Sequence, residues 1–291
     1  MPELGKPQNT IDIIKKYDFR FRKKFGQNFL IDTNVLGKIA DSACIDPEDC
    51  VLEIGPGIGT MTGYLSEAAR EVVCVEIDRS LAKIHEETLA DCPNVTVRYE
   101  DVLKTDLQEI AESANGGKPM KVVANLPYYV TTPILMELLK KIELFESITV
   151  MVQKEVAARV CAAPGSKDCG AITYAVQYYA KPEVMLQVPP SSFIPRPEVD
   201  SCVLRLTAYK EPPVKADEEL MFALIRAAFN QRRKTLANAL ANGLDYHGKK
   251  ISRGAAAAAI TSLGLPETVR GERLSLAEFA ALADGVRFDI N

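Results

Sequence analysis

Short apolar runs alternate with stretches of helical periodicity up to about Tyr209. The runs are rich in Val, Ile and Cys and carry few charges, as strands buried on both faces of a parallel sheet do. Between them, apolar residues recur at the spacing of amphipathic helices. The alternation predicts an α/β domain. The expected strands are Cys50–Ile54, Glu71–Ile77, Val95–Tyr99, Lys121–Asn125 and Ile148–Gln153, and the expected helices are Thr60–Ala69, Arg79–Leu89 and Pro133–Ile142.

The pattern changes towards the end of this domain. Two further strands are expected at Val184–Val188 and Cys202–Thr207, a late position that suits antiparallel strands added to a parallel sheet. The stretch 211–213, Glu-Pro-Pro, is typical of a linker. Beyond it the periodicity predicts helices only, at Glu218–Phe229, Arg233–Ala241, Gly254–Leu263 and Ser275–Ala283.

Three parts follow from this pattern. We expect an N-terminal extension over residues 1–18, an α/β domain over residues 19–210, and a smaller all-α domain over residues 211–291. A chain of 291 residues is long enough for one large domain and a smaller one.

The composition is that of a globular protein, with 47% hydrophobic and 25% charged residues. No apolar run approaches the length of a membrane helix, and the basic residues between Arg20 and Lys24 interrupt any signal sequence. The seven cysteines form no C-x-x-C pair and are odd in number, so we expect reduced thiols in a cytoplasmic protein. With only His85 and His247 available, no metal site is expected, and each histidine is expected at the surface.

The net charge of −4 argues against a nucleic-acid-binding protein, but the basic residues are unevenly distributed. Residues 1–211 carry a net charge of −6, and residues 212–291 carry +2. A single basic cluster is more often a solvated surface, whereas two clusters on an acidic chain favour local contacts with phosphates. The first cluster is Arg20, Arg22, Lys23 and Lys24, and the second is Arg226, Arg232, Arg233 and Lys234.

The tetrapeptide Asn125-Leu126-Pro127-Tyr128 closes the expected strand Lys121–Asn125. It therefore lies at the carboxyl end of the sheet, where open α/β folds bind their ligands. The amide and carbonyl oxygens can accept hydrogen bonds from an exocyclic amino group, and the tyrosine ring can stack on its base. The tetrapeptide thus indicates a site for adenine or cytosine.

Gly55, Gly57 and Gly59 follow the first expected strand, at the usual position of a nucleotide cofactor. A tight turn alone would also explain a G-x-G sequence. The dinucleotide fingerprint would place its third glycine at position 60, which is Thr, and Pro56 removes one amide donor. The loop therefore favours a mononucleoside cofactor over NAD or FAD.

Acidic residues follow the next two expected strands. Glu76 lies 21 residues after Gly55 and suits the two hydroxyls of a ribose, whereas Asp78 suits a cap for the helix from Arg79. Asp101 could accept from an adenine amino group, and a helix cap explains it equally well. The glycine loop, the two acids and the tetrapeptide form one ordered series along the expected sheet.

This series resembles the S-adenosylmethionine-dependent methyltransferase fold, a Rossmann-like sheet, and its last member resembles the Asn/Asp-x-Pro-Tyr/Phe motif of amino-group methylases. The chain as a whole resembles the ribosomal RNA adenine dimethyltransferases, most closely the bacterial small-subunit enzymes. The resemblance runs from about residue 20 to residue 285 and leaves residues 1–18 outside. The segments that carry it are Lys24–Leu30, Asn125–Tyr129, Phe193–Ser201 and Phe229–Leu236.

The resemblance implies S-adenosylmethionine as cofactor and, as substrate, N6 of two adjacent adenosines near the 3′ end of 16S rRNA in a partly assembled small (30S) subunit. It also implies a role in small-subunit biogenesis, with no membrane partner, and a monomer is expected. Cofactor contacts are implied for Asn28, Leu30, Gly55, Gly57, Glu76, Asp101 and Asn125. The catalytic groups would be Asn125, Leu126, Pro127 and Tyr128, with Phe193 as a second stacking face, and RNA would bind Arg22, Lys23, Lys24, Arg232, Arg233 and Lys234.

Three alternatives stay open. The large-subunit rRNA methylases that confer macrolide resistance share the catalytic motifs but tend to be strongly basic, unlike this chain with its pI of about 5.5. An NAD-dependent oxidoreductase is disfavoured by the glycine spacing. A mainly non-catalytic assembly factor is disfavoured by the intact tetrapeptide from Asn125 to Tyr128.

Overall fold

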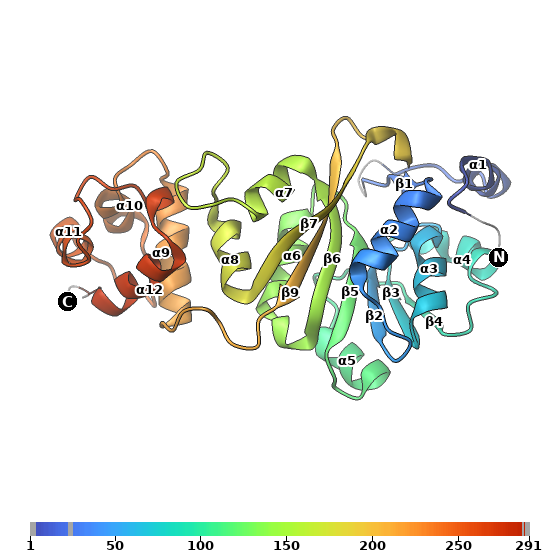
Figure 1. Cartoon of the computed structure of the whole chain (residues 1–291), viewed down its shortest axis with the longest axis horizontal. Helices are drawn as coiled ribbons and strands as arrows, with labels where there is room; N and C mark the ends of the chain where they lie inside the picture. Colours follow the sequence, from blue (N-terminus) through green and yellow to red (C-terminus); the bar gives the residue numbers. More distant parts are fainter. Residues whose placement is uncertain (1–3, 23–25, 287, 289–291) are drawn as a thin grey trace. The chain divides into compact units, whose positions relative to one another are not determined.

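The computed structural model describes residues 4–22, 26–286 and 288 (Figure 1). They form two compact units. The first contains the described residues up to Ala157 together with Lys181–Ala208, and the second contains Ala158–Ala180 and the described residues from Tyr209 onward. Within the part of the chain that the structure describes, no helix is long and apolar enough to cross a membrane.

A seven-stranded sheet in the order β4-β3-β2-β5-β6-β9-β7 organises the first unit. The first five strands in this order are parallel, and β9 runs antiparallel to β6, which confirms the α/β fold and the direction expected of the strand Cys202–Thr207. The chain builds outward from β2 in one direction and then returns to place β5 on its other side. The switch point of the sheet therefore lies between β2 and β5, where such folds bind ligands.

The strand bounds are close to those expected from the sequence. They are β2 (Cys50–Ile54), β3 (Glu71–Val75), β4 (Val95–Arg98), β5 (Met120–Asn125), β6 (Phe145–Gln153), β7 (Ala180–Val188) and β9 (Ser201–Ala208). Because β3 and β4 end earlier than expected, Glu76 and Asp101 lie in the loops just beyond them. A separate two-stranded pairing joins β1 (Phe29–Leu30) to β8 (Phe193–Ile194).

Helices cover both faces of the sheet. In Figure 1, α2 (Thr33–Ala43) and α3 (Thr60–Ala68) lie in front of the strands and α6 (Thr131–Lys140) lies behind them. Apolar side chains of α2 and α3 pack in one cluster with Val51, Val123 and Val203 of the sheet. The expected helix Arg79–Leu89 is a 3-10 turn followed by α4 (Ala82–Thr88), while α2 and α5 (Leu107–Asn115) were not expected.

The described residues before Asp18 are part of the first unit. They contain α1 (Pro7–Lys16), which begins with proline, a residue suited to a first helical position. At its end, the Lys16 ammonium and the Tyr17 hydroxyl both donate to the Glu87 carboxylate of α4. Apolar side chains of this N-terminal segment join a cluster that reaches the glycine loop. Its fully buried members are Leu4, Ile13, Phe29, Ile58, Leu81 and Ile84.

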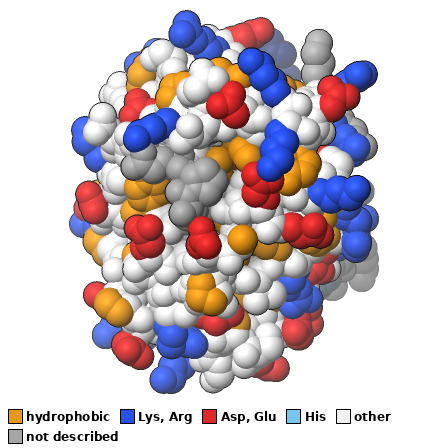
Figure 2. Space-filling model, turned by 90° about the vertical axis from the view of Figure 1, so that its right-hand side faces the viewer, with side chains coloured by type: hydrophobic (Ala, Val, Ile, Leu, Met, Phe, Trp, Pro, Cys, Tyr) orange, Lys and Arg blue, Asp and Glu red, His pale blue; other side chains and the backbone are white. Residues whose placement is uncertain are grey.

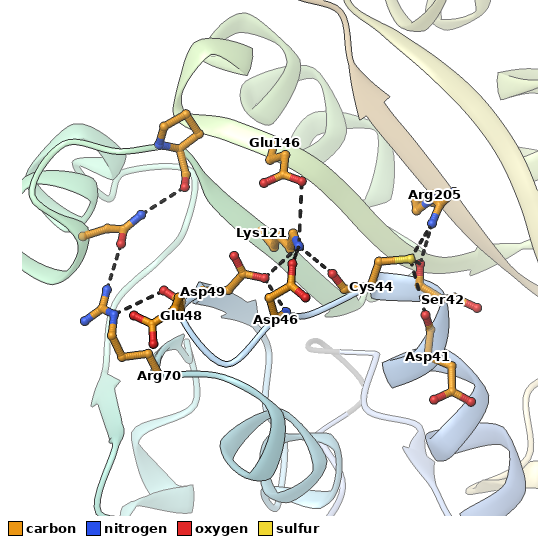
Figure 3. A network of polar contacts seen from close by, with 12 residues as sticks. Asp41, Ser42, Cys44, Asp46, Glu48, Asp49, Arg70, Lys121, Glu146 and Arg205 are labelled. Atoms are coloured by element: carbon orange, nitrogen blue, oxygen red, sulfur yellow. Dashed lines mark hydrogen bonds and ion pairs between the residues drawn. The ribbon is translucent and has the colours of Figure 1, made fainter.

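A network around Lys121 of β5 closes the amino edge of the sheet (Figure 3). The Lys121 side chain is 5% exposed, its Nζ donates to the Cys44 carbonyl oxygen at 2.5 Å, and it lies 2.7 Å from the Asp49 carboxylate. Asp46 and Glu146 lie within 4 Å as well, at 3.9 and 3.8 Å. Burial lowers the pKa of Lys121, but the hydrogen bond to Asp49 and the surrounding acids outweigh it and raise the pKa overall.

The second unit is helical. It contains α8 (Ala171–Tyr179), α9 (Glu218–Asn230), α10 (Leu236–Gly243), α11 (Arg253–Ser262) and α12 (Leu276–Gly285), and the chain passes into it through α7 (Lys154–Val160). The sequence placed the boundary at 210/211, whereas Ala158–Ala180 also pack in this unit. The reason is aromatic packing: the Tyr174 ring contacts Phe279 and Phe229, and its hydroxyl donates to the Leu274 carbonyl oxygen at 2.6 Å.

Candidate active site

A cavity opens at the carboxyl edge of the sheet, at the switch point between β2 and β5. Its walls come from the loops after β2, β3, β4 and β5 and from the segment Gly26–Leu30. The structure thus brings together the whole set of cofactor residues that the sequence implied, along with the tetrapeptide after β5. These lining residues are Asn28, Leu30, Gly55, Gly57, Glu76, Asp101, Asn125, Leu126, Pro127 and Tyr128.

The glycine loop needs glycine for two physical reasons. Gly55 and Gly57 have φ values of +71° and +60°, in the left-handed region that side chains disfavour. A Cβ atom on Gly57 would also lie 3.0 Å from the Phe29 ring. The Gly55 N–H donates to the Val75 carbonyl oxygen at 2.9 Å, which ties the loop to the end of β3.

Glu76 is buried at the wall of the cavity, with 5% of its surface exposed. One carboxylate oxygen accepts from the Gly57 N–H at 3.2 Å and the other from the Asp78 N–H at 2.8 Å. Burial raises the pKa of Glu76 to about 7, against the lowering effect of these backbone donors. The two donors fix the orientation of the carboxylate towards the cavity.

Glu53 of β2 is a second buried acid in the cavity wall, and the sequence did not single it out. It is 2% exposed, and burial raises its pKa to about 7. Among the described residues, neither Glu53 nor Glu76 forms an ion pair. The carboxyl edge therefore holds two acids whose charge nothing in the described chain neutralises.

Asp78 anchors the segment Gly26–Leu30, which lines the cavity and is called the covering segment below. As expected from the sequence, it caps the turn after β3, accepting from the Ser80 N–H at 3.1 Å. It also accepts from Gln27 at 3.0 Å and pairs with Arg22 at 3.3 Å. Burial alone would raise the pKa of Asp78, but the hydrogen bonds from Ser80 and Gln27 and the Arg22 charge lower it. Reading the sequence as a simple cap missed this anchoring role.

Asp101 lies in the loop after β4 and serves the local turn as well as the cavity. Its Oδ1 accepts from the Leu103 N–H at 3.1 Å, and its backbone carbonyl accepts from the Lys104 N–H at 2.8 Å. Leu103 and Ile77 also line the cavity, and they are 40% and 46% exposed. Two exposed apolar side chains beside an acid suit the faces and the amino group of a purine.

The tetrapeptide after β5 is held by the covering segment and by the neighbouring strand. The Asn125 side-chain NH₂ donates to the Asn28 carbonyl oxygen at 3.0 Å. The Leu126 N–H donates to the Met151 carbonyl oxygen of β6 at 3.2 Å. With its NH₂ group engaged, Asn125 presents its amide oxygen as an acceptor, which is the group an incoming amine requires.

The two tyrosines after Pro127 are held differently. The Tyr128 hydroxyl lies 2.7 Å from the hydroxyl of the buried Ser201 in β9, so its ring is fixed at the cavity wall. Tyr129 is 59% exposed and lies over Gly26, where a Cβ atom would be 3.2 Å from the ring. The absence of a side chain at Gly26 lets the covering segment approach the tetrapeptide closely.

Comparisons with known proteins agree with the arrangement of these residues in the cavity. The model of the ribosomal RNA adenine dimethylase family matches residues 18–261. The chain belongs to this family. It is 56% identical over 286 residues to a ribosomal RNA small subunit methyltransferase A of Lachnoclostridium phytofermentans, covering 98% of both chains. A protein of the same name from Alkaliphilus metalliredigens is 52% identical over 287 residues, covering 98% of this chain and 99% of that protein.

Solved structures of the family share the fold. A dimethyladenosine transferase from Plasmodium falciparum superposes with a TM-score of 0.71 at 26% identity, covering 87% of this chain and 95% of that chain. The 23S rRNA methyltransferase ErmE superposes with a TM-score of 0.65 at 26% identity, covering 89% and 99%. The sequence-based resemblance to the rRNA adenine dimethyltransferases is thereby confirmed.

Phe193 does not occupy the place expected of it. Its side chain is 1% exposed and packs in the apolar cluster with Leu30 and Val188, because β8 pairs with β1 there. It is not among the residues that line the cavity. In this structure Phe193 is a core aromatic, and a second stacking face would have to come from another residue.

The described members of the two basic clusters are all exposed, and some of them also pair within the chain. Arg22 pairs with Asp78, and Arg232 donates to Glu272 at 2.7 Å and to the Lys167 carbonyl oxygen at 2.8 Å. Arg233 and Lys234 are exposed, whereas Lys23 and Lys24 lie outside the described residues. Figure 2 shows basic and acidic side chains interspersed over one end of the first unit.

The histidines are unlike each other. His247 is exposed and lies 3.3 Å from Glu219, whereas His85 is buried, so the expectation of a surface position is wrong for His85. Its ring nitrogens find partners in Gly57 and Tyr99, which are remote in sequence. Over the described ranges, no group of three or more His, Cys, Asp or Glu side chains is arranged to hold a metal ion.

Proposed function

We propose that this chain transfers methyl groups from S-adenosylmethionine to N6 of two adjacent adenosines near the 3′ end of 16S rRNA, giving dimethyladenosines. The observation that carries the proposal is the position of Asn125 and Leu126, at the carboxyl end of β5 in one cavity with the glycine loop and Glu76. Relatives at 46 to 56% identity over nearly the full length are named small subunit methyltransferases, which favours 16S rRNA over the 23S rRNA of the macrolide-resistance type.

The cofactor residues suit the parts of S-adenosylmethionine. Glu76 would accept from both ribose hydroxyls, and Asp101 would accept from the adenine amino group between Ile77 and Leu103. Asn28, Leu30, Gly55 and Gly57 would contact the methionine end. When bound, the cofactor supplies a methyl group already activated by a positively charged sulfur, and the uncompensated acids Glu53 and Glu76 favour that charge.

The tetrapeptide suits the target amine. The lone pair of adenine N6 is delocalised into the ring, so the nitrogen is a poor nucleophile. The Asn125 amide oxygen and the Leu126 carbonyl oxygen would accept its two hydrogens and favour a more tetrahedral nitrogen as the methyl group transfers. Pro127 stiffens the loop, and Tyr128 would stack on the flipped base, an interaction worth roughly 1–3 kcal/mol.

The substrate is proposed to be 16S rRNA within the small (30S) subunit or its precursor, met in the cytoplasm by a monomeric enzyme with a role in subunit biogenesis. The exposed Arg233 and Lys234 are proposed to contact phosphates, with Lys23 and Lys24 as further candidates. Arg22 and Arg232 would have to exchange an internal ion pair for an RNA contact.

The test is methylation of ribosomal subunits by the purified protein. Small and large subunits from a strain lacking this protein would be incubated with methyl-labelled S-adenosylmethionine, and the rRNA analysed by primer extension and by mass spectrometry of its nucleosides. The proposal expects dimethyladenosine at two adjacent positions of 16S rRNA. Label in 23S rRNA alone, or in neither rRNA, would contradict it.

A further inference from the structure

His85 is a buried residue of α4 for which the proposed chemistry has no use. It is 5% exposed, and both ring nitrogens have partners. Nε2 lies 2.6 Å from the Gly57 carbonyl oxygen of the glycine loop, and Nδ1 lies 2.8 Å from the Tyr99 hydroxyl in the loop after β4. The His85 and Tyr99 rings lie nearly parallel, with centroids 5.8 Å apart and an angle of 23° between their planes.

The partners determine the protonation of the ring. Burial lowers the pKa of His85, so the imidazole is neutral near pH 7 and has one donor and one acceptor nitrogen. The Gly57 carbonyl can only accept, so Nε2 carries the proton and donates to it. Nδ1 is then the acceptor, and the Tyr99 hydroxyl donates to it. Tyr99, His85 and Gly57 thus form one directed chain of hydrogen bonds.

At both of its ends, this series of hydrogen bonds reaches residues that are proposed to bind the cofactor. Gly57 is held through its carbonyl by His85 and through its N–H by Glu76, at 3.2 Å. Tyr99 comes two residues before Asp101 in the same loop. His85 therefore links the loop with the glycines, the acid suited to ribose and the loop with the acid suited to adenine.

We propose that His85 is a positioning residue, which holds Gly57 and Tyr99 at a fixed separation and so sets the distance between the ribose and adenine subsites of the cofactor cavity. The inference rests on the proposed function, because it assumes that this cavity binds S-adenosylmethionine. His85 touches neither the reacting methyl group nor the target base, so its effect falls on cofactor binding rather than on methyl transfer.

Calorimetric titration with S-adenosylmethionine tests the proposal. His85→Leu leaves the Gly57 carbonyl without its buried donor, so the dissociation constant should rise about ten-fold, while kcat at saturating cofactor stays within about two-fold. His85→Gln can still place an N–H near that carbonyl and should recover most of the affinity. Tyr99→Phe removes only the hydrogen bond from Tyr99 to His85 and should raise the dissociation constant about three-fold.

His247→Leu is the matched control, because it makes the same substitution at the exposed histidine of the other unit. Its cofactor affinity should equal that of the unmodified protein. If His85→Leu and His85→Gln both bind as tightly as the unmodified protein, His85 only fills space and the proposal is wrong. Failure of the unmodified protein to bind S-adenosylmethionine would instead refute the proposed function, and this inference with it.

A second measurement covers the case in which His85→Leu does not fold. Nitrogen-15 NMR of the unmodified protein should show His85 as the Nε2-protonated tautomer, and Tyr99→Phe should shift the Nδ1 resonance while cofactor affinity falls about three-fold. An Nδ1-protonated ring, or Tyr99→Phe with unchanged cofactor affinity, would overturn the proposal.

Discussion

The two edges of the sheet differ in whether their buried ionisable groups have partners of opposite charge. At the amino edge, the ammonium of Lys121 is surrounded by Asp49, Asp46 and Glu146 and donates to a backbone carbonyl (Figure 3). At the carboxyl edge, Glu53 and Glu76 are equally buried, yet within the described part of the chain no cation pairs with either. The buried ammonium at the amino edge has its partners within the chain, whereas the buried acids at the carboxyl edge have no partner cation among the described residues.

This difference indicates which edge of the sheet stabilises the fold and which edge binds a ligand. A buried charge whose partners all lie within the chain needs no ligand to balance it, and removing it destabilises the fold because its partners are left uncompensated. Buried acids with pKa values near 7 are costly to leave ionised, and a ligand that brings hydroxyl donors and a positive charge offsets that cost. Changes at the carboxyl edge should therefore alter binding and turnover, and changes at the amino edge should alter stability.

The largest effect is expected for Asn125→Ala, which removes a proposed acceptor of the target amine. Methyl transfer to 16S rRNA should fall about 100- to 1000-fold, by analogy with the loss of one preorganised hydrogen-bonding group from an active site. Cofactor binding should remain measurable, although Asn125 is also a proposed cofactor contact. Asn34→Ala, at an exposed position of α2, is the control. Normal turnover in Asn125→Ala would remove Asn125 from the mechanism.

Glu76→Ala should weaken cofactor binding about 100-fold, because two hydrogen bonds from ribose hydroxyls to a carboxylate are lost. Isothermal titration calorimetry with S-adenosylmethionine measures this. The neighbouring exposed acid Glu86, changed to Ala, should leave the dissociation constant as it is. An unchanged constant in Glu76→Ala would mean that the ribose binds elsewhere.

Lys121→Met keeps the buried aliphatic stem but removes the ammonium from the amino edge. The free energy of unfolding should fall by about 2 kcal/mol, less than for a fully buried pair because Asp46 and Glu146 are largely exposed. Urea denaturation measures it, with the exposed Lys118→Met as control. Cofactor affinity should not change, and a parallel loss of affinity would undo the distinction between the two edges.

Cofactor binding should strengthen about ten-fold between pH 6 and pH 8. The sign follows from Glu76, whose pKa in the folded protein is raised to about 7 by burial. Its ionised form accepts from both ribose hydroxyls, so below pH 7 binding must first expel a proton. Glu76→Gln should bind weakly with little pH dependence. If its affinity still rises with pH as in the unmodified protein, the titrating group is Glu53 instead.

The sequence was most informative where function depends on positions just after strands. β2 was predicted with its bounds because four of its five residues are apolar and a glycine loop follows them. Glu76 and Asp101 were found for the same reason: each follows a strand, and parallel strands bring their carboxyl ends to one edge. Such residues can be placed without knowing any long-range contact.

Residues whose role depends on distant contacts were misplaced or missed. His85 contacts Gly57 and Tyr99, 28 and 14 residues away, and nothing in its local helix indicates burial against them. Phe193 lies in a motif typical of the family, but the β1–β8 pairing that buries its ring is a contact across more than 160 residues. Only the packing shows what these two side chains touch.

The boundary of the helical unit also depends on long-range contacts that the sequence does not show. The linker after residue 210 was visible from its prolines, whereas Ala158–Ala180 join the later helices through long-range contacts, among them those of Tyr174 and Tyr178, whose rings pack on aromatic residues of α9 and α12. A tyrosine in an amphipathic helix does not reveal which of two cores it enters.

A thermal-shift titration of Glu76→Gln and Lys121→Met with S-adenosylmethionine tests the contrast between the edges most directly. Glu76→Gln should melt close to the unmodified protein without cofactor but lose the cofactor-induced rise in Tm. Lys121→Met should melt several degrees lower and keep the full rise. The opposite result, with Lys121→Met losing the rise and Glu76→Gln keeping it, would contradict the assignment of binding to the carboxyl edge and of stability to the amino edge.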